Sequence, residues 1–247
     1  MTQEDFFSKA LRRTALFFSR NYFRAEVRGL SHIPEGPCLL VGNHNCIGVV
    51  NPEIWIFGAH YLSDKKRRPL KALGHDIVTR IPVASALSVK YLGYIPNNSQ
   101  AAVQSLKEGN NVLVYPGGGW ESCRPSSERD RIDFKNRSGF VKVARAAGVP
   151  IVPVVSSGAH DGVYIWRRGH RIAKWLGLHR LFRIDAFPIG LSFPFLIHVG
   201  PLFPFFPLPR KVKMEILPPV FIEKDLNDVE IAQKIVSMMQ ETLTSLR

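Results

Sequence analysis

The sequence predicts an α/β fold with a mixed, mostly parallel central sheet that is flanked by helices. Three short apolar runs, typical of buried strands, lie at residues 38–41, 111–115 and 151–155. Each run stops at glycine, asparagine, proline or serine, and helical patterns lie between the runs, which favours parallel pairing. Ligands of such folds bind beyond the carboxyl ends of the strands, so the residues after these runs are the first candidates for a site.

The N-terminal element, residues 1–24, is predicted to be an amphipathic helix that runs from Glu4 to about Tyr22. Phe6, Phe17 and other apolar side chains lie close to one face, and the cations mostly lie elsewhere. Such a helix can lie in the interface of a membrane. Packing of the same helix against the rest of the chain is the alternative.

The helix that follows the first run has a clear start, since Asn51, Pro52 and Glu53 are an N-cap, a first-turn proline and a first-turn acid. It is expected to end near Leu62. The other predicted elements are strands at 23–29, 71–73 and 211–217, and helices at 83–92, from a Ser99 cap to about 109, at 138–147 and at 227–246.

The charge of the chain is strongly positive. The 247 residues include 33 Lys and Arg against 20 Asp and Glu, which gives a net charge of +13. This surplus indicates a polyanionic partner, which could be a nucleic acid, an anionic membrane face or a phosphorylated substrate. Solubility alone is the alternative. The three cysteines show no metal-ligand spacing, and their odd number indicates a reducing compartment.

Residues 165–183 combine cations with tryptophans and aliphatic side chains. This composition is typical of a membrane-surface element, because the rings lie at headgroup level and the cations meet phosphates. It could also bind RNA. No plain transmembrane helix is predicted, since the long uncharged run at 186–209 is interrupted by prolines throughout.

His44 is the leading candidate for proton transfer, because it closely follows the first apolar run. An imidazole can take a proton from a substrate hydroxyl near neutral pH. A carboxylate or amide should fix its tautomer, and Glu53 in the next helix is the candidate. A hydrogen-bonded structural histidine is the alternative interpretation.

A glycine-rich loop, Pro116 to Gly119, follows the second run. Its backbone N–H groups could bind an oxyanion or a phosphate, and a plain tight turn is the alternative. No Gly-Lys-Ser/Thr follows, which argues against a nucleoside triphosphate enzyme. The cations after the loop suit a phosphorylated ligand or form a solvated face: Arg124, Arg129, Arg131, Lys135 and Arg137.

Five segments occur in the order of a known set of motifs. They are Gly42-Asn43-His44, residues 91–96, the aromatic-Pro-Gly-Gly segment at 115–118, Arg137-Ser138-Gly139-Phe140 and Val-Pro-Ile-Val-Pro-Val at 149–154. Together they resemble the glycerolipid and lysophospholipid acyltransferases, the lysophosphatidate-acyltransferase-like family. The resemblance covers roughly residues 24 to 220.

Two departures from the family pattern bring the chain nearer to one branch. The acid that normally follows the histidine closely is missing, and Glu53 is its substitute. The loop at 115–121 lacks the usual Glu and following Arg, and is similar to the Pro-Gly-Gly-x-x-Glu loop of the second diacylglycerol acyltransferase family. Since the usual phosphate-recognising Arg is missing, a neutral acceptor such as mono- or diacylglycerol is the alternative to a lysophospholipid.

The resemblance implies an enzyme of lipid metabolism that transfers a fatty acyl group from acyl-CoA or acyl carrier protein to a hydroxyl. It implies no metal, no cofactor and no covalent acyl-enzyme. It assigns general-base catalysis to His44 and the orientation of that histidine to Glu53. It assigns substrate binding to Asn43, Tyr115, Pro116, Gly117, Gly118, Gly119, Glu121 and Arg137.

The resemblance also implies an acyltransferase domain at 25–247 and a membrane-associated enzyme whose active site faces the cytoplasm. Its expected partners are membrane lipids and the acyl donor. No nucleic acid is expected, because no RNA-binding motif is visible. A non-catalytic membrane- or lipid-binding protein is the alternative from another class.

Overall fold

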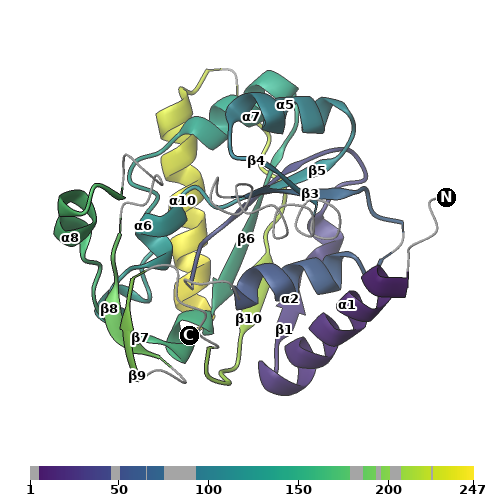
Figure 1. Cartoon of the computed structure of the whole chain (residues 1–247). Helices are drawn as coiled ribbons and strands as arrows, with labels where there is room; N and C mark the ends of the chain where they lie inside the picture. The colour runs from purple at the N-terminus through teal and green to yellow at the C-terminus, as the bar shows by residue number, and fades with distance from the viewer. Residues whose placement is uncertain are drawn as a thin grey trace.

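The computed structural model of the protein contains a mixed central sheet with helices on both faces and a small sheet beside it (Figure 1). The predicted fold class is therefore confirmed. The structure describes residues 6–45, 51–64, 66–74, 93–178, 186–192, 196–200, 207–223 and 225–247.

Within these residues, the strands of the central sheet lie in the order β1-β10-β6-β2-β5-β3-β4. Neighbouring strands pair in parallel except β10 and β6, which are antiparallel. The three apolar runs of the sequence form β6, β2 and β5 at the centre. The bounds are β1 Glu26–Arg28, β2 Leu39–Gly42, β3 Leu70–Gly74, β4 Tyr94–Pro96, β5 Asn111–Val114, β6 Ile151–Ser157 and β10 Lys213–Ile216.

The predicted helices that lie within the described residues are present, and short helical segments at 118–122, 126–128, 159–162 and 170–175, which the sequence patterns do not predict, lie between them. The predicted Ser99 cap is wrong, because Asn98 is the N-cap and its Oδ1 accepts a hydrogen bond from the Ala101 N–H at 2.8 Å. The predicted helix at 83–92 lies outside the described residues. The bounds are α1 Phe6–Phe17, η1 Phe18–Tyr22, η2 Leu30–His32, α2 Pro52–Tyr61, α5 Ser99–Lys107, α6 Gly118–Ser122, η3 Ser126–Glu128, α7 Gly139–Ala147, η4 Ala159–Gly162, α8 His170–Trp175 and α10 Asp228–Ser245.

The two faces of the central sheet have separate hydrophobic cores. Successive side chains of β2 point to opposite faces, as the pleat requires. Leu39 and Val41 therefore pack in the core beneath α5, α7 and α10, whereas Leu40 packs in the core with α2. Because both faces are covered, the strands are buried and their carboxyl ends can position a site.

The N-terminal helix packs against α2. Arg12 Nη1 donates a hydrogen bond to the Leu62 carbonyl at 2.8 Å, and Ser19 Oγ lies 3.0 Å from His60 Nε2. Phe17 and Phe18 remain exposed. The helix is thus attached to the domain, and its predicted association with a membrane stays a prediction. No helix in the described ranges is both long and apolar enough to cross a bilayer.

The small sheet forms from the basic, tryptophan-containing region and the proline-rich segment after it. Its antiparallel strands are β7 Tyr164–Arg167, β8 Ile189–Ser192 and β9 Leu196–Val199. Val163, Ile165 and Ala186 form a small buried cluster with Cys123, which directly follows α6. The small sheet therefore packs beside the chain segment that carries the glycine-rich loop.

Candidate active site

The predicted contact between His44 and Glu53 is present. His44 follows β2, Glu53 lies in the first turn of α2, and the His44 Nδ1–Glu53 Oε1 distance is 2.7 Å. The imidazole is 15% exposed and the carboxylate only 1%. Because a carboxylate accepts, Nδ1 carries the proton and the lone pair lies on Nε2, the arrangement that a general base requires.

The charge of Glu53 is maintained despite its burial. Burial raises the pKa of this carboxyl, but the hydrogen bond and charge of His44 and the Asn45 N–H outweigh it and hold the pKa below its ordinary value. The Asn45 N–H lies 3.0 Å from Glu53 Oε1. The site therefore keeps a buried negative charge beside the imidazole, which stabilises an imidazolium when a proton is taken up.

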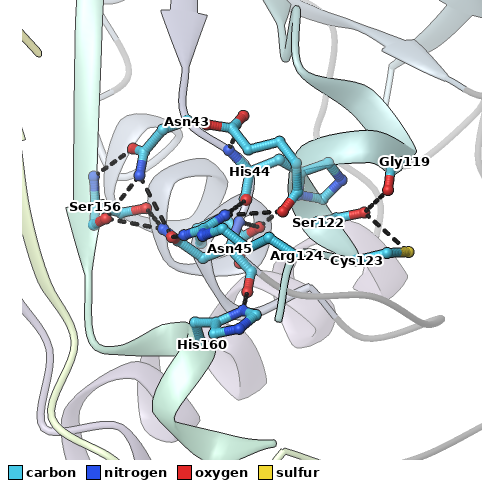
Figure 2. Close-up of polar contacts among 11 residues, drawn as sticks. Asn43, His44, Asn45, Gly119, Ser122, Cys123, Arg124, Ser156 and His160 are labelled. Carbon is cyan, nitrogen blue, oxygen red and sulfur yellow. Dashed lines mark hydrogen bonds and ion pairs between the residues drawn. The ribbon is translucent and has the colours of Figure 1, made fainter. Parts of the chain in front are cut away.

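The backbone of His44 is fixed on both sides by residues of the segment after the glycine-rich loop (Figure 2). Its N–H donates to Glu121 Oε2 at 2.9 Å, and its carbonyl accepts from Arg124 Nη1 at 2.6 Å. Arg124 is 1% exposed and also donates to Asn45 Oδ1 at 2.5 Å and to the Arg129 carbonyl at 3.0 Å. These contacts join the two loops of the site into one unit.

Glu121 is buried rather than open to a substrate. Its Oε1 accepts a second backbone hydrogen bond, from the Asp133 N–H at 3.4 Å. Burial raises the pKa of Glu121 to about 7, although the Arg124 guanidinium opposes that rise. A Cβ at Gly117 would overlap this carboxylate, so the loop needs glycine there. Glu121 thus holds the backbone of His44, and its expected role in substrate binding stays a prediction.

A buried amide network fixes the other side of the histidine loop. Asn43 exchanges two hydrogen bonds with the backbone of Ser156, at 2.8 and 2.9 Å. Asn45 Nδ2 donates to the Ser156 carbonyl at 2.8 Å. Asn43 is only 1% exposed and joins the end of β2 to that of β6. Its expected contact with substrate stays a prediction.

His160, in η4, is a second buried histidine next to this network. Its Nδ1 donates to the Asn45 carbonyl at 2.6 Å, and its Nε2 has no hydrogen-bond partner among the described residues. Burial, and then the charge of Arg124, lower the pKa of His160 to about 4. At neutral pH it is an uncharged donor that supports the loop behind His44.

The glycine-rich loop is shorter than expected, because Gly118 and Gly119 already belong to α6. The Gly118 N–H donates to the Tyr115 carbonyl at 3.0 Å, so this N–H is occupied. The Tyr115 ring lies 5.0 Å from the His44 ring. Arg137 Nη1 donates to the Pro116 carbonyl at 2.7 Å. The structure thus places the Tyr115 ring beside His44 and Arg137 against the backbone of the glycine-rich loop.

A groove of about 180 Å³ adjoins the loop. Two of the predicted site residues, Pro116 and Arg137, line it. The other lining residues combine an apolar wall with a few polar groups: Leu39, Leu73, Val114, Phe140 and Val143, and Asn97, Asn98, Ser99 and Gly139. Such a groove suits a ligand with an apolar chain and a polar end.

Sequence reasoning missed the supporting role of Arg124, Asn45 and His160. The sequence places Arg124 among cations that are solvated or bind a ligand, and its spacing of three residues from Glu121 is the available signal. Asn45 adjoins His44 in the sequence, and His160 closely follows the third predicted strand. Only the fold shows that these side chains meet behind the histidine.

Comparison with known proteins defines the class. The family model described as acyltransferase matches residues 24–157, more than half of the chain, and the chain belongs to this family. The family predicted from the motifs is therefore confirmed. The fold also matches the crystal structure of the 1-acyl-sn-glycerophosphate acyltransferase PlsC from Thermotoga maritima, with a TM-score of 0.61 and 16% identity over 97% of this chain and 80% of that chain.

The curated relatives are longer than this chain. An uncharacterized protein of Mycobacterium tuberculosis strain H37Rv is 28% identical over 96% of this chain and 64% of its own length. A Bos taurus protein named DGAT1/2-independent enzyme synthesizing storage lipids is 31% identical over 68% of this chain and 48% of its own length. The Mus musculus protein of the same name is 30% identical over 68% of this chain and 49% of its own length. The chain thus spans less than two thirds of these relatives.

Proposed function

We propose that this protein is a glycerolipid O-acyltransferase. It moves a fatty acyl group from acyl-CoA or acyl carrier protein to a hydroxyl of a glycerolipid or lysophospholipid. The observation that carries this proposal is the 2.7 Å pair of His44 and Glu53 at the carboxyl end of β2, beside the glycine-rich loop. A partly exposed imidazole oriented by a buried carboxylate is the arrangement that activates a hydroxyl.

In the proposed reaction, His44 Nε2 takes the proton of the acceptor hydroxyl as its oxygen attacks the thioester carbonyl. The new carbon–oxygen bond gives a tetrahedral oxyanion. Collapse of this species breaks the carbon–sulfur bond, and the imidazolium returns its proton to the departing thiolate. Glu53 stabilises the imidazolium, and no covalent acyl-enzyme, metal or cofactor takes part.

The backbone at Gly117 and Gly119 is proposed to meet the oxyanion or the acceptor, since the Gly118 N–H is already bonded. Tyr115 and Pro116 form the wall beside His44. Arg137, at the rim of the groove, is proposed to bind a polar part of a substrate. These roles are supported by the contact of the Tyr115 ring with His44, by the hydrogen bond of Arg137 to the Pro116 carbonyl and by the place of Pro116 and Arg137 in the groove lining.

A neutral acceptor, mono- or diacylglycerol, is the second candidate. The observation that favours it is the burial of Arg124, whose guanidinium already donates to the carbonyl and amide oxygens of the protein. The relatives named for storage lipid synthesis support the same alternative. Parallel assays with diacylglycerol and lysophosphatidate, using one acyl donor, separate the two candidates.

The enzyme is also proposed to be membrane-associated, with residues 1–24 as the amphipathic membrane-associating helix and the active site facing the cytoplasm. Exposed Phe17 and Phe18, next to exposed Arg13 and Arg20, support this role. Membrane lipids and the acyl donor are its proposed partners.

The test of the proposed function is the substitution His44→Ala in the purified protein. We expect acyl transfer to fall by about 10²–10⁴, because the general base is lost. Product formation is measured with acyl-CoA and with acyl carrier protein as donors, and His32→Ala serves as a control at an exposed histidine on η2. Unchanged transfer by His44→Ala would refute the mechanism, whereas absence of transfer in the wild type as well would favour a non-catalytic lipid-binding protein.

A further inference from the structure

The outward face of the small sheet carries a row of large apolar side chains that solvent reaches. The exposed fractions are 49% for Tyr164, 60% for Trp166, 42% for Leu191, 67% for Ile197 and 41% for Val199. Exposed patches of this kind mark membrane or protein interaction sites.

The strand register places Tyr164, Leu191, Ile197 and Val199 on one face. Trp166 lies at a register shift of β7 and adjoins this face through its ring contact with Tyr164. Tyr164 pairs with Leu191, and Leu191 pairs with Ile197, so the three form a row across the sheet. Val199 lies two residues after Ile197 and faces the same way. The Tyr164 and Trp166 rings meet edge to face with centroids 6.2 Å apart. The opposite face is the buried one, with Ile165 packed against Cys123.

Helix α8 adds two more exposed apolar side chains and most of the charge. Trp175 is 84% exposed and Leu176 is 41% exposed. The exposed cations around them are Arg167, Arg171 and Lys174. No Asp or Glu occurs between residues 162 and 184 of the sequence. The sheet face is therefore apolar and aromatic, and the charges that β7 and α8 carry beside it are positive. The nearby acid, Glu128, is paired with Arg168 at 2.7 Å.

We propose that this docking face, formed by Tyr164, Trp166, Arg167, Arg171, Lys174, Trp175, Leu191, Ile197 and Val199, binds the interface of an anionic lipid bilayer. Tryptophan and tyrosine are favoured at headgroup level, and each nearby cation strengthens binding to anionic lipid. A second copy of the chain is a poor occupant, since two such faces would bring like charges together. The inference goes beyond the proposed function, which placed membrane association in residues 1–24.

The docking face is joined to the site. The Ile165 N–H donates to Ser126 Oγ at 2.9 Å, and Arg168 lies over the Trp120 ring at 3.8 Å from its centroid. Trp120 belongs to α6, the same helix whose Glu121 fixes the backbone of His44. Docking through this face would therefore set the orientation of the acyl-transfer site relative to the bilayer.

The experiment is flotation of the purified full chain with vesicles, without acyl donor. One vesicle is phosphatidylcholine alone and the other contains phosphatidylglycerol as well. We expect binding to the anionic vesicles, reduced about tenfold or more in Trp166→Ser/Ile197→Ser and in Arg171→Gln/Lys174→Gln. The matched controls, Phe221→Ser/Val229→Ser and Lys107→Gln/Lys142→Gln, remove exposed apolar groups and cations elsewhere and should bind like the wild type.

A second measurement locates the contact. Brominated phospholipid should quench the tryptophan fluorescence of the wild type, and this quenching should fall in Trp166→Phe/Trp175→Phe, whose binding the phenylalanines preserve. Undiminished quenching in that variant overturns the proposal. The proposal is also overturned if only Phe17→Ser/Phe18→Ser reduces vesicle binding. It is overturned as well if the protein is a dimer and the docking-face substitutions dissociate that dimer without changing flotation.

The outcome is separable from that of the proposed function. His44→Ala keeps the docking face intact and should float like the wild type whether or not it is active. If the protein lacks acyl transfer but docks through this face, only the proposed function fails. If it transfers acyl groups but the docking-face variants float normally, only this inference fails.

Discussion

His44 is oriented through three separate bonds. Glu53 holds the imidazole, and Glu121 and Arg124 hold the two backbone groups of the same residue. A general base works only when its lone pair lies within hydrogen-bond reach of the proton to be moved. Glu121 and Arg124 meet this requirement, because a backbone that is held at both its N–H and its carbonyl leaves the His44 ring little freedom to move.

The substitution Glu53→Gln tests the role of the carboxylate. We expect kcat to fall by about 10²–10⁴ with a smaller change in KM, because the amide does not neutralise an imidazolium and permits the wrong tautomer. Steady-state kinetics over a range of acceptor concentrations measure both constants.

Glu35→Gln, at an exposed carboxylate outside the site, is the matched control and should leave both constants unchanged. A Glu53→Gln enzyme with wild-type kcat would show that Glu53 does not act on the proton transfer.

The pairing of His44 with Glu53 could be predicted, because both residues flank recognisable ends of elements. The role of Arg124 could not be predicted, because the sequence contains many cations and each of them is expected to be exposed to solvent. A buried guanidinium needs several hydrogen-bond acceptors, and two of those that bind Arg124 belong to residues about eighty positions earlier in the sequence. Such a set is visible only after folding.

Helix α10 begins with a capping box that completes one face of the core. Asn227 Oδ1 accepts from the Val229 and Glu230 N–H groups, both at 3.0 Å, and Glu230 Oε2 accepts from the Asn227 N–H at 3.0 Å. Ile235 and Met239 of this helix are fully buried against the sheet. The start of the helix therefore contributes to the stability of the whole core.

Asn227→Ala should lower the free energy of unfolding by about 1 kcal/mol, because two N–H groups lose their acceptor. Urea denaturation monitored by circular dichroism measures the change. Asn227→Ser keeps an acceptor oxygen and should retain most of the stability. An Asn227→Ala midpoint equal to that of the wild type would contradict a stabilising cap.

Helices and strands could be predicted where residues close together in the sequence determine them. The central strands and the start of α2 follow from apolar runs and from Asn51-Pro52-Glu53, which act within a few residues. The conversion of Gly118 and Gly119 into the start of α6 was missed, because glycine has little helix propensity of its own. The arrangement of the small sheet depends on pairing across distant segments, which no local pattern encodes.

The unfolding free energy of the whole molecule should depend on pH through His160. Its pKa is about 4 in the folded protein and near 6.5 otherwise, so the unfolded chain binds more protons between these values. The contribution of His160 to stability is therefore expected to fall as pH drops from about 6.5 to 4, by about 3 kcal/mol at most. Relative to the wild type, His160→Asn should therefore gain stability towards pH 4 in urea titrations over this range.

His170→Asn, at an exposed histidine on α8, is the control and should follow the wild type. Glu121 acts with the opposite sign, since its raised pKa of about 7 makes stability fall as pH rises from about 4.5 to 7. Because Glu121 is present in the wild type and in both variants, its contribution cancels when their unfolding free energies are compared. Equal acid sensitivity of His160→Asn and the wild type would contradict the assignment.

The place of β10 between β6 and β1 has a consequence for biosynthesis. The ribosome makes Glu26–Arg28 nearly two hundred residues before Lys213–Ile216, and within the described part of the chain the first strand pairs with the second alone. Until the late strand emerges, the nascent polypeptide must carry an open edge along β6, and open edges invite mispairing with other chains. Completion of this side of the sheet therefore waits for the synthesis of Lys213–Ile216, and we expect the open edge to need chaperone protection until then.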